Sequence, residues 1–186
     1  YEWNELEKVR ALSPILSELV EESSTIEAII CGYIYSARLA YLDKLPQQAL
    51  QILAEGEALA KQEACHLALV NILAERVRLL ISLDMSSAAQ QSANDLYLAC
   101  EQRQSEEPHQ WLDSDYLRDM TIIRLELYNQ DIQQGIGLAS HHIEKAQQQG
   151  RHYPLVQLCL LKAVMLSKAS KEKHALKFTA EAIHYG

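Results

Sequence analysis

Hydrophobic residues recur along the chain at alternating intervals of three and four, the spacing at which side chains share one face of an α-helix. Two such stripes are Leu6, Val9, Leu12, Leu16 and Leu19, and Leu69, Ile72, Leu73, Val77, Leu80 and Ile81. The breaks between stripes are short and polar, as at Asp43-Lys44 and Asn129-Gln130-Asp131. Because turns this short join antiparallel neighbours, the pattern predicts a series of helix hairpins.

The expected elements are nine helices in four and a half hairpins. Their predicted ranges are 5–21, 25–42, 46–62, 65–83, 87–104, 112–129, 132–149, 153–168 and 172–184. Pro46 falls at the first position of a helix, where proline is tolerated, and Gly150 falls where a helix ends. Pro14 lies inside the first helix and is expected to bend it.

The turns also repeat at a nearly constant interval, which is typical of stacked repeats rather than of a bundle closed around one centre. At the start of each second helix, an apolar residue is followed one helical turn later by a small or slim residue. The later positions are Val9, Ala49, Ala88, Gly135 and, more loosely, Ala175, at intervals of 40, 39, 47 and 40 residues. The longest interval contains an irregular stretch, 105–110, that is expected to be a local insertion. We therefore predict an all-α fold, an α-solenoid (superhelix) of antiparallel hairpins, as a single domain over residues 1–186.

The amino-acid composition agrees with long helices and argues against some classes of function. Only 6 glycines and 4 prolines occur, too few to turn the many strands of a sheet protein of this size. The net charge is −8, and lysines and arginines form no run. The sequence therefore lacks the positively charged patch that is typical of a DNA-binding domain. No signal peptide and no membrane span is recognised. A cytoplasmic protein is expected because the cysteines are expected to be reduced thiols.

The four cysteines are expected to be buried, reduced thiols. Cys31, Cys65, Cys100 and Cys159 lie 34 or more residues apart within apolar patterns, without a C-x-x-C pair. None has a histidine on its own helical turn except Cys65, whose neighbour His66 points elsewhere. A thiol without a nearby base is a poor nucleophile, so we expect no enzymatic activity.

Metal binding is not predicted either. Glu63-x-x-His66 and Glu181-x-x-His184 have a spacing at which two side chains can meet one metal ion. The first pair falls at a predicted helix junction and the second at the frayed end of a helix, so neither is expected to be a site. His141 and His142 are adjacent and diverge by about 100°, and both are expected at the surface.

Hairpins with a period of about forty residues resemble lengthened tetratricopeptide (TPR) repeats, as in the large, ATP-dependent LuxR-family transcriptional activators of the MalT type. The motifs that carry the resemblance, over essentially the whole chain, are Tyr1-Glu2-Trp3-Asn4-Glu5-Leu6; Ala37-Arg38-Leu39 with Gln48-Ala49-Leu50-Gln51-Ile52-Leu53 and Glu57-Ala58-Leu59-Ala60; and Gly150-Arg151 with Leu155, Leu158, Leu160-Leu161 and Ala163. The sequence departs from that family at Lys44, where glycine is usual, and at the insertion.

The resemblance implies a TPR-like sensor domain of a bacterial signal-transduction ATPase, which binds a small-molecule inducer or a regulatory protein. ATP and DNA would be bound by an N-terminal module and a C-terminal helix-turn-helix outside these residues, since no G-x-x-x-x-G-K-[ST] motif occurs here. The chain is thus expected to be part of a longer protein, without a cofactor of its own. Self-association through the exposed ends of the stack is a further expectation.

The alternative is a free-standing TPR scaffold that binds a partner peptide. Scaffolds of the carboxylate-clamp type pair lysine and asparagine on the groove helices. The matching positions here hold Ile34 with Arg38 and Ala74 with Arg78, which makes a clamp of that type less favourable.

The candidate binding residues are arginines that recur at one phase of the repeat, on helices that line the concave surface of TPR-like stacks. Arg78 has Glu75 at i−3 for a local ion pair, whereas Arg38 and Arg124 have no acidic residue three or four positions away in either direction. They are therefore expected either to form interhelical salt bridges or lie on a solvated rim, or to face a ligand or partner.

Tyrosines flank two of these arginines and complete the candidate site. Aromatic rings beside hydrogen-bonding groups suit sugars, peptides or an anionic metabolite, and ordinary core packing is the alternative. The whole set is Arg38, Arg78 and Arg124 with Tyr35, Tyr41 and Tyr128.

Overall fold

The computed structural model describes residues 7–8, 10–12, 26–104 and 113–186. Eight helices are complete in this part of the chain, and it contains no strand. They are α2 (Ile26–Leu42), α3 (Pro46–Gln62), α4 (His66–Ser82), α5 (Ser86–Gln104), α6 (Asp113–Tyr128), α7 (Ile132–Gln148), α8 (His152–Lys168) and α9 (Glu172–Tyr185). Their ends lie within one residue of the predicted ranges, so the apolar periodicity located the helices correctly.

The predicted first helix is described only in part. Residues 7–8 and 10–12 are helical, in agreement with the expected range. The Arg10 guanidinium donates to both carboxylate oxygens of Asp43, at 2.8 and 2.5 Å, next to the end of α2. The proline bend, the Tyr-Glu-Trp-Asn motif, Val9 and the 105–110 insertion lie outside the described residues.

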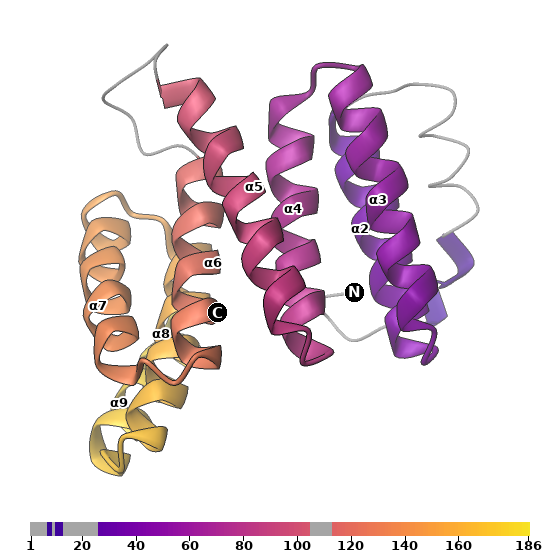
Figure 1. Ribbon diagram of the computed structural model, residues 1–186. Helices are drawn as coiled ribbons and strands as arrows, with labels where there is room; N and C mark the ends of the chain where they lie inside the picture. The colour runs from indigo at the N-terminus through magenta and orange to yellow at the C-terminus, as the bar shows by residue number, and fades with distance from the viewer. Residues whose placement is uncertain (1–6, 9, 13–25, 105–112) are drawn as a thin grey trace. The chain divides into compact units, whose positions relative to one another are not determined.

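The helices pack as antiparallel neighbours in two compact units, residues 1–110 and 111–186 (Figure 1). In the first unit α2 contacts α3, α3 contacts α4, and α4 contacts α5; the second unit repeats this order with α6 to α9. The first helices of successive hairpins also touch, α2 with α4 and α6 with α8. Among the described residues, α2 does not contact α5 and α6 does not contact α9, as they would in a closed four-helix bundle. The fold is therefore an all-α helical repeat of the predicted solenoid type.

Within each unit the first helices form the tighter row. Contacts join α2 to α4 and α6 to α8, whereas the described parts of α3 and α5, and of α7 and α9, do not touch. A stack of hairpins curves so that the row of helices that lie closer together is on its inner, concave side. The first helices, which carry the candidate arginines, are therefore the inner helices of each unit.

Six turns in the described part of the chain share one hydrogen-bond geometry. In each, a residue with positive φ follows the helix, and the next amide donates to a carbonyl five residues earlier, as Leu45 N–H does to Ala40 at 2.9 Å. This is the Schellman arrangement, in which glycine is usual because a side chain is strained at positive φ. Only Gly150 is a glycine; the other five are Lys44, Ala64, Asp84, Gln130 and Ser170, with φ between 50 and 65°. The departure from glycine at Lys44 therefore leaves the turn geometry unchanged.

The repeat register differs from the prediction at one position. The buried small residues that follow the turns are Ala49, Ala89, Gly135 and Ala175. Ala88, the predicted residue, is partly exposed, because the turn places the core-facing position four residues after Met85, whose carbonyl accepts from Ala89 N–H at 2.9 Å. The true intervals are 40, 46 and 40 residues, so every hairpin aligns without an internal gap.

Each unit has its own hydrophobic core. The first centres on residues such as Ile29, Leu53 and Ile72, and the second on Met120, Ile123 and Leu158. None of the described helices is both long and apolar enough to cross a lipid bilayer.

Candidate functional site

A buried carboxylate joins two of the predicted arginines in the first unit. Arg38 of α2 donates from Nε and Nη2 to the two oxygens of Glu75 on α4, at 2.8 and 2.9 Å. Arg78, one turn further along α4, donates to the same oxygens at 3.0 and 2.5 Å. The interhelical salt bridge expected of Arg38 and the local pair expected of Arg78 are therefore both present, and they share one acceptor.

Glu75 stays ionised because of these two partners. Its side chain is only 6% exposed, and burial by itself raises the pKa of a carboxyl group. Burial is the largest single influence on its pKa, but the hydrogen bonds and charges of Arg38 and Arg78 together outweigh it and lower the pKa from 4.5 to about 2. Two guanidinium groups on one carboxylate leave the cluster with a net charge of +1 at neutral pH.

The cluster is accessible from the inner row of helices. The side chains of Arg38 and Arg78 are 25 and 31% exposed, although Glu75 beneath them is buried. The Arg38 guanidinium carbon also lies 5.8 Å from the centre of the Tyr35 ring, within cation–π range. The cluster therefore presents fixed cationic donors beside one aromatic face.

Arg124 has a different environment in the second unit. Its Nη2 donates to Gln157 Oε1 on α8 at 3.3 Å. In α8 the position that corresponds to Glu75 is occupied by Leu161, which has no acceptor in its side chain. The residue of α8 that aligns with Arg38, Arg78 and Arg124 is Val164, so the recurring arginines do not continue into α8.

The other two candidate tyrosines, Tyr41 and Tyr128, lie in different surroundings from Tyr35. Tyr41 packs against the hydrophobic core of the first unit, which agrees with the core-packing alternative. Tyr128 is half-buried near the end of α6, in the other unit. Of the six candidates, the structure brings together Arg38, Arg78 and Tyr35, around a glutamate that the sequence identified only as a partner of Arg78.

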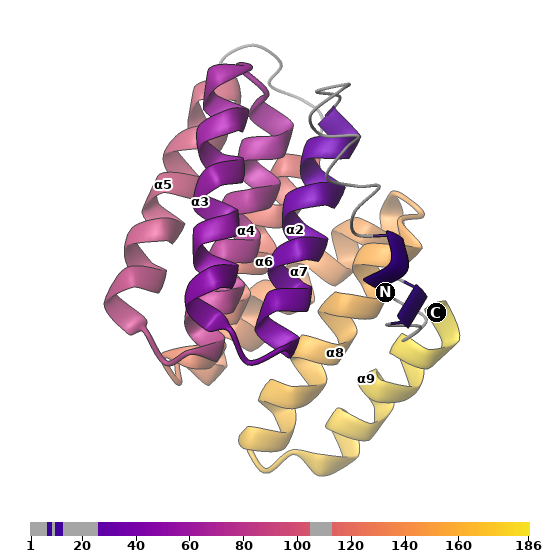
Figure 2. The same ribbon diagram turned by 90° about the vertical axis from the view of Figure 1, so that its right-hand side faces the viewer.

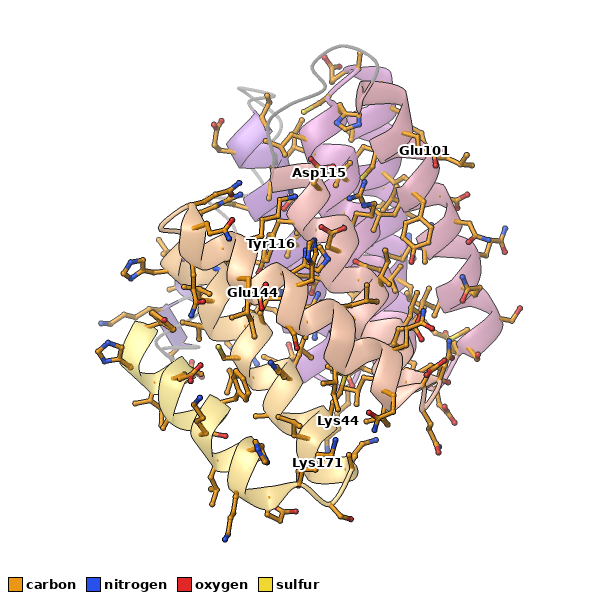
Figure 3. All side chains as sticks on the ribbon, turned by 90° about the vertical axis from the view of Figure 1, so that its left-hand side faces the viewer. Lys44, Glu101, Asp115, Tyr116, Glu144 and Lys171 are labelled. Atoms are coloured by element: carbon orange, nitrogen blue, oxygen red, sulfur yellow. The ribbon has the colours of Figure 1, made fainter. Side chains whose placement is uncertain are left out.

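A second polar cluster contradicts the prediction that His142 is a surface residue. Its side chain is 12% exposed, and its Nδ1 lies 3.3 Å from a carboxylate oxygen of the buried Asp119 on α6. Arg118 donates to the other oxygen at 3.0 and 2.9 Å and also reaches Asp115, at 3.3 Å. Figure 3 labels Asp115 in this part of α6.

Comparison of the repeats explains this burial. The corresponding pairs in the other hairpins are Tyr33 with Gly56, Leu73 with Leu96, and Cys159 with Ala182. Asp119 and His142 thus occupy a position where the first and second helices of a hairpin pack together. The repeat alignment would have revealed this pair, whereas the local pattern around two adjacent histidines could not.

The pKa of His142 follows from its surroundings. Burial lowers the pKa below 6.5, the charge of Asp119 raises it, and His141, Lys145 and Arg118 lower it further, with a net downward shift. His142 is therefore neutral at pH 7.

The cysteines and His66 show no catalytic arrangement among the described residues. All four thiols are free; three are buried, as expected, whereas Cys31 is partly exposed. Burial raises the pKa of Cys31 and raises that of Cys159 to about 11, which opposes thiolate formation. His66 donates from Nε2 to the Ala99 carbonyl at 2.6 Å, because a carbonyl can only accept.

Neither Glu-x-x-His pair belongs to a larger cluster of metal-binding residues. The described part of the chain contains no group of three or more histidine, cysteine, aspartate or glutamate side chains that could hold an ion. In comparisons with known proteins, no protein-family model matches the chain and no curated protein matches its sequence.

Proposed function

We propose that the chain is a recognition domain: the TPR-like sensor segment of a MalT-like, LuxR-family transcriptional activator. In this proposal an inducer or a regulatory protein binds to the inner row of helices. Its occupancy then biases an ATPase and a DNA-binding module that lie outside these residues. The family assignment depends on the resemblance of the sequence motifs and the forty-residue hairpin period.

The observation that carries the binding role is the Arg38–Glu75–Arg78 cluster on α2 and α4. Glu75 holds two guanidinium groups in fixed positions, and the cluster has a net positive charge. Fixing a long side chain before binding lowers the entropy cost of recognition. The ligand chemistry that suits the cluster is an anionic group, such as a carboxylate or phosphate, beside an apolar or sugar ring that can stack on Tyr35.

Binding can be tested by thermal unfolding of the 186-residue chain with dicarboxylates, sugar phosphates and acidic peptides. A ligand of the folded state raises the midpoint temperature by mass action. We expect at least one of these anions to do so, and Arg38→Ala to reduce the shift. The matched control is Arg76→Ala, which removes another interhelical pair, Arg76 with Glu57 at 2.7 Å, between α4 and α3. If the ligand raised the midpoint temperature equally in Arg38→Ala and Arg76→Ala, the cluster would have only a structural role.

The family assignment has a separate test. The reading frame that encodes these residues should contain a phosphate-binding G-x-x-x-x-G-K-[ST] motif before them and a helix-turn-helix after them. A frame with neither module would overturn the assignment to a transcriptional activator and favour the free-standing scaffold. Ile34 and Ala74, which occupy the clamp positions, are buried at 8 and 4% exposure, so a scaffold of this kind would not use a lysine–asparagine clamp.

A further inference from the structure

The arginine cluster on α2 and α4 has hydrogen-bond donors that Glu75 does not use. The two helices contact each other in the first unit (Figure 2). Arg78 donates to Glu75 from Nε and Nη2, at 3.0 and 2.5 Å, so one edge of its guanidinium faces the buried carboxylate. A guanidinium has five N–H donors, and three of them remain on the edge formed by Nη1 and Nη2. This second edge of Arg78 points away from Glu75 and has the fork geometry that binds a further carboxylate.

The charge of the inner row in the first unit depends on this cluster. The other side chains of α2 and α4 that can be charged near neutral pH are Glu27, His66 and Arg76. Glu27 precedes Arg38 by 11 residues, about 16 Å along the helix axis, which exceeds the screening length of about 8 Å at physiological salt. His66 is the first residue of α4, and Arg76 pairs with Glu57 of α3 at 2.7 Å. A ligand at the cluster therefore meets a local net charge of +1.

A net charge of +1 favours a monoanion over a dianion. The attraction between the ligand and the cluster grows in proportion to the charge of the ligand, whereas the cost of removing the ligand from water grows with the square of that charge. This cost matters here because Arg38 and Arg78 are only 25 and 31% exposed. A dianion also brings a second negative charge toward Glu75, on the other side of the same guanidinium groups. The head group that fits the cluster best is therefore a carboxylate.

An exposed apolar residue lies next to the cluster on α2. Leu42 follows Arg38 by four residues, so it lies one helical turn further along the same face, and it is 42% exposed. Ser82, the aligned residue of α4, is exposed as well, although α2 packs against that helix. This position is thus open in both first helices of the unit. Leu42 can contact the apolar body of a ligand whose carboxylate binds the arginines.

We infer, on the basis of the binding role proposed for the cluster, that its ligand is a monocarboxylate whose apolar body lies on Leu42. Dianionic head groups, such as phosphate monoesters at neutral pH, bind more weakly. A small organic acid and the C-terminal carboxylate of a peptide share this chemistry. Benzoate and an N-acetylated hexapeptide that ends in leucine represent the two sources, and the tighter ligand of the two identifies the source.

The test of the head group compares three ligands with one benzene ring: benzoate, phenylphosphonate and the monomethyl ester of phenylphosphonate. At pH 8.5 benzoate and the ester carry one negative charge and phenylphosphonate carries two, while Glu75, with a pKa of about 2, is ionised. Dissociation constants for the 186-residue chain are measured by ligand-observed NMR. We expect benzoate and the ester to bind about tenfold more tightly than phenylphosphonate.

The test of the apolar contact uses Leu42→Gln with benzoate and acetate. The substitution should weaken benzoate about fivefold and leave acetate, which has no ring, unchanged. Because Leu42 is exposed, the fold should remain intact, which thermal unfolding checks. The matched control is Leu98→Gln, at a residue of α5 that is 59% exposed, and it should bind benzoate as the unchanged chain does.

The outcomes separate this inference from the proposed function. Phenylphosphonate that binds as tightly as benzoate, or benzoate that binds equally to Leu42→Gln and the unchanged chain, would overturn the inference and leave anion recognition by the cluster in place. Absence of binding by benzoate and the hexapeptide, while another anion binds, would overturn it in the same way. If no anion at all bound to the chain, the proposed function would fail as well.

Discussion

At the scale of single residues, the molecule depends on a few buried ionic groups at positions that are otherwise apolar. Glu75 holds Arg38 and Arg78, and Asp119 holds Arg118 next to His142. A buried charge without a partner is expensive, so removal of either carboxylate has consequences beyond the loss of one hydrogen bond. Both clusters also respond to pH, with signs that follow from their pKa shifts.

Glu75→Gln should lower the free energy of unfolding at pH 7 by about 3 kcal/mol, the equivalent of the pKa shift from 4.5 to about 2. Since the pKa of the folded state is the lower one, this stability is complete above pH 4.5 and is lost as the pH falls toward 2. Urea unfolding at pH 7 and 3.5 measures it, with the exposed Glu63→Gln as control. An unchanged gap between Glu75→Gln and the unchanged chain at the two pH values would contradict the prediction.

His142 should make the stability of the second unit decrease in mild acid. Its folded pKa is below 6.5, so the unfolded chain takes up the proton first, and stability is complete above that pH and falls as the pH drops below it. His142→Leu, which copies the aligned Leu96, should flatten the dependence of the urea midpoint on pH between 7.5 and 5. His141→Gln, at an exposed residue, should retain it; equal slopes in both variants would refute the role of His142.

The contacts of these residues were not equally predictable from the sequence. The ion pair of Arg78 with Glu75 was predictable because both lie on one helix, three residues apart. The partner of Arg38 lies 37 residues away and depends on how α2 packs on α4, which local spacing does not determine. The burial of His142 was missed for the same reason, because it depends on how α7 packs against α6.

At the scale of the helices and turns, the same Schellman geometry is formed with different residues at the position of positive φ. Five of the six Schellman turns place a side chain at positive φ, which costs each of them about 1 kcal/mol or more relative to glycine. After four of these turns a buried small residue, Ala49, Ala89, Gly135 or Ala175, allows the helices to pack closely.

Lys44→Gly should therefore raise the free energy of unfolding by about 1 kcal/mol, because Lys44 has a φ of 62°. Gly150→Ala, at a φ of 65° with open space around the added carbon, should lower it by a similar amount. Thermal or urea unfolding measures both changes. Effects of equal sign in the two variants would show that φ does not limit the stability of these turns.

Two glycines inside helices should respond oppositely to alanine. A β-carbon on Gly56 would lie 2.6 Å from Cγ of Tyr33 and 2.9 Å from its Cβ, so Gly56→Ala should destabilise the first unit by about 1 to 3 kcal/mol. Gly137 has nothing within 4 Å, and Gly137→Ala should add about 0.5 to 1 kcal/mol of helix stability. Stabilisation by both substitutions, in urea unfolding, would mean that the contact of Tyr33 with Gly56 does not constrain the hairpin.

At the scale of the whole molecule, each of the two units is a stack of hairpins, and the proposed recognition surface lies on inner helices of the first unit. The helices and their repeat were predictable, because one apolar stripe and one short turn recur about every forty residues. The side chains that meet between helices were predictable only in part.

The most direct test of the central claim is an NMR titration that follows the arginine Nε–H signals of the 186-residue chain. The titrant is an anion that raises the thermal midpoint. We expect the Nε signals of Arg38 and Arg78 to shift with the ligand concentration, whereas the Nε signal of Arg76, which pairs with Glu57 on α3, stays in place. Saturable binding that leaves the Arg38 and Arg78 signals unchanged would contradict the claim that the inner helices recognise the ligand.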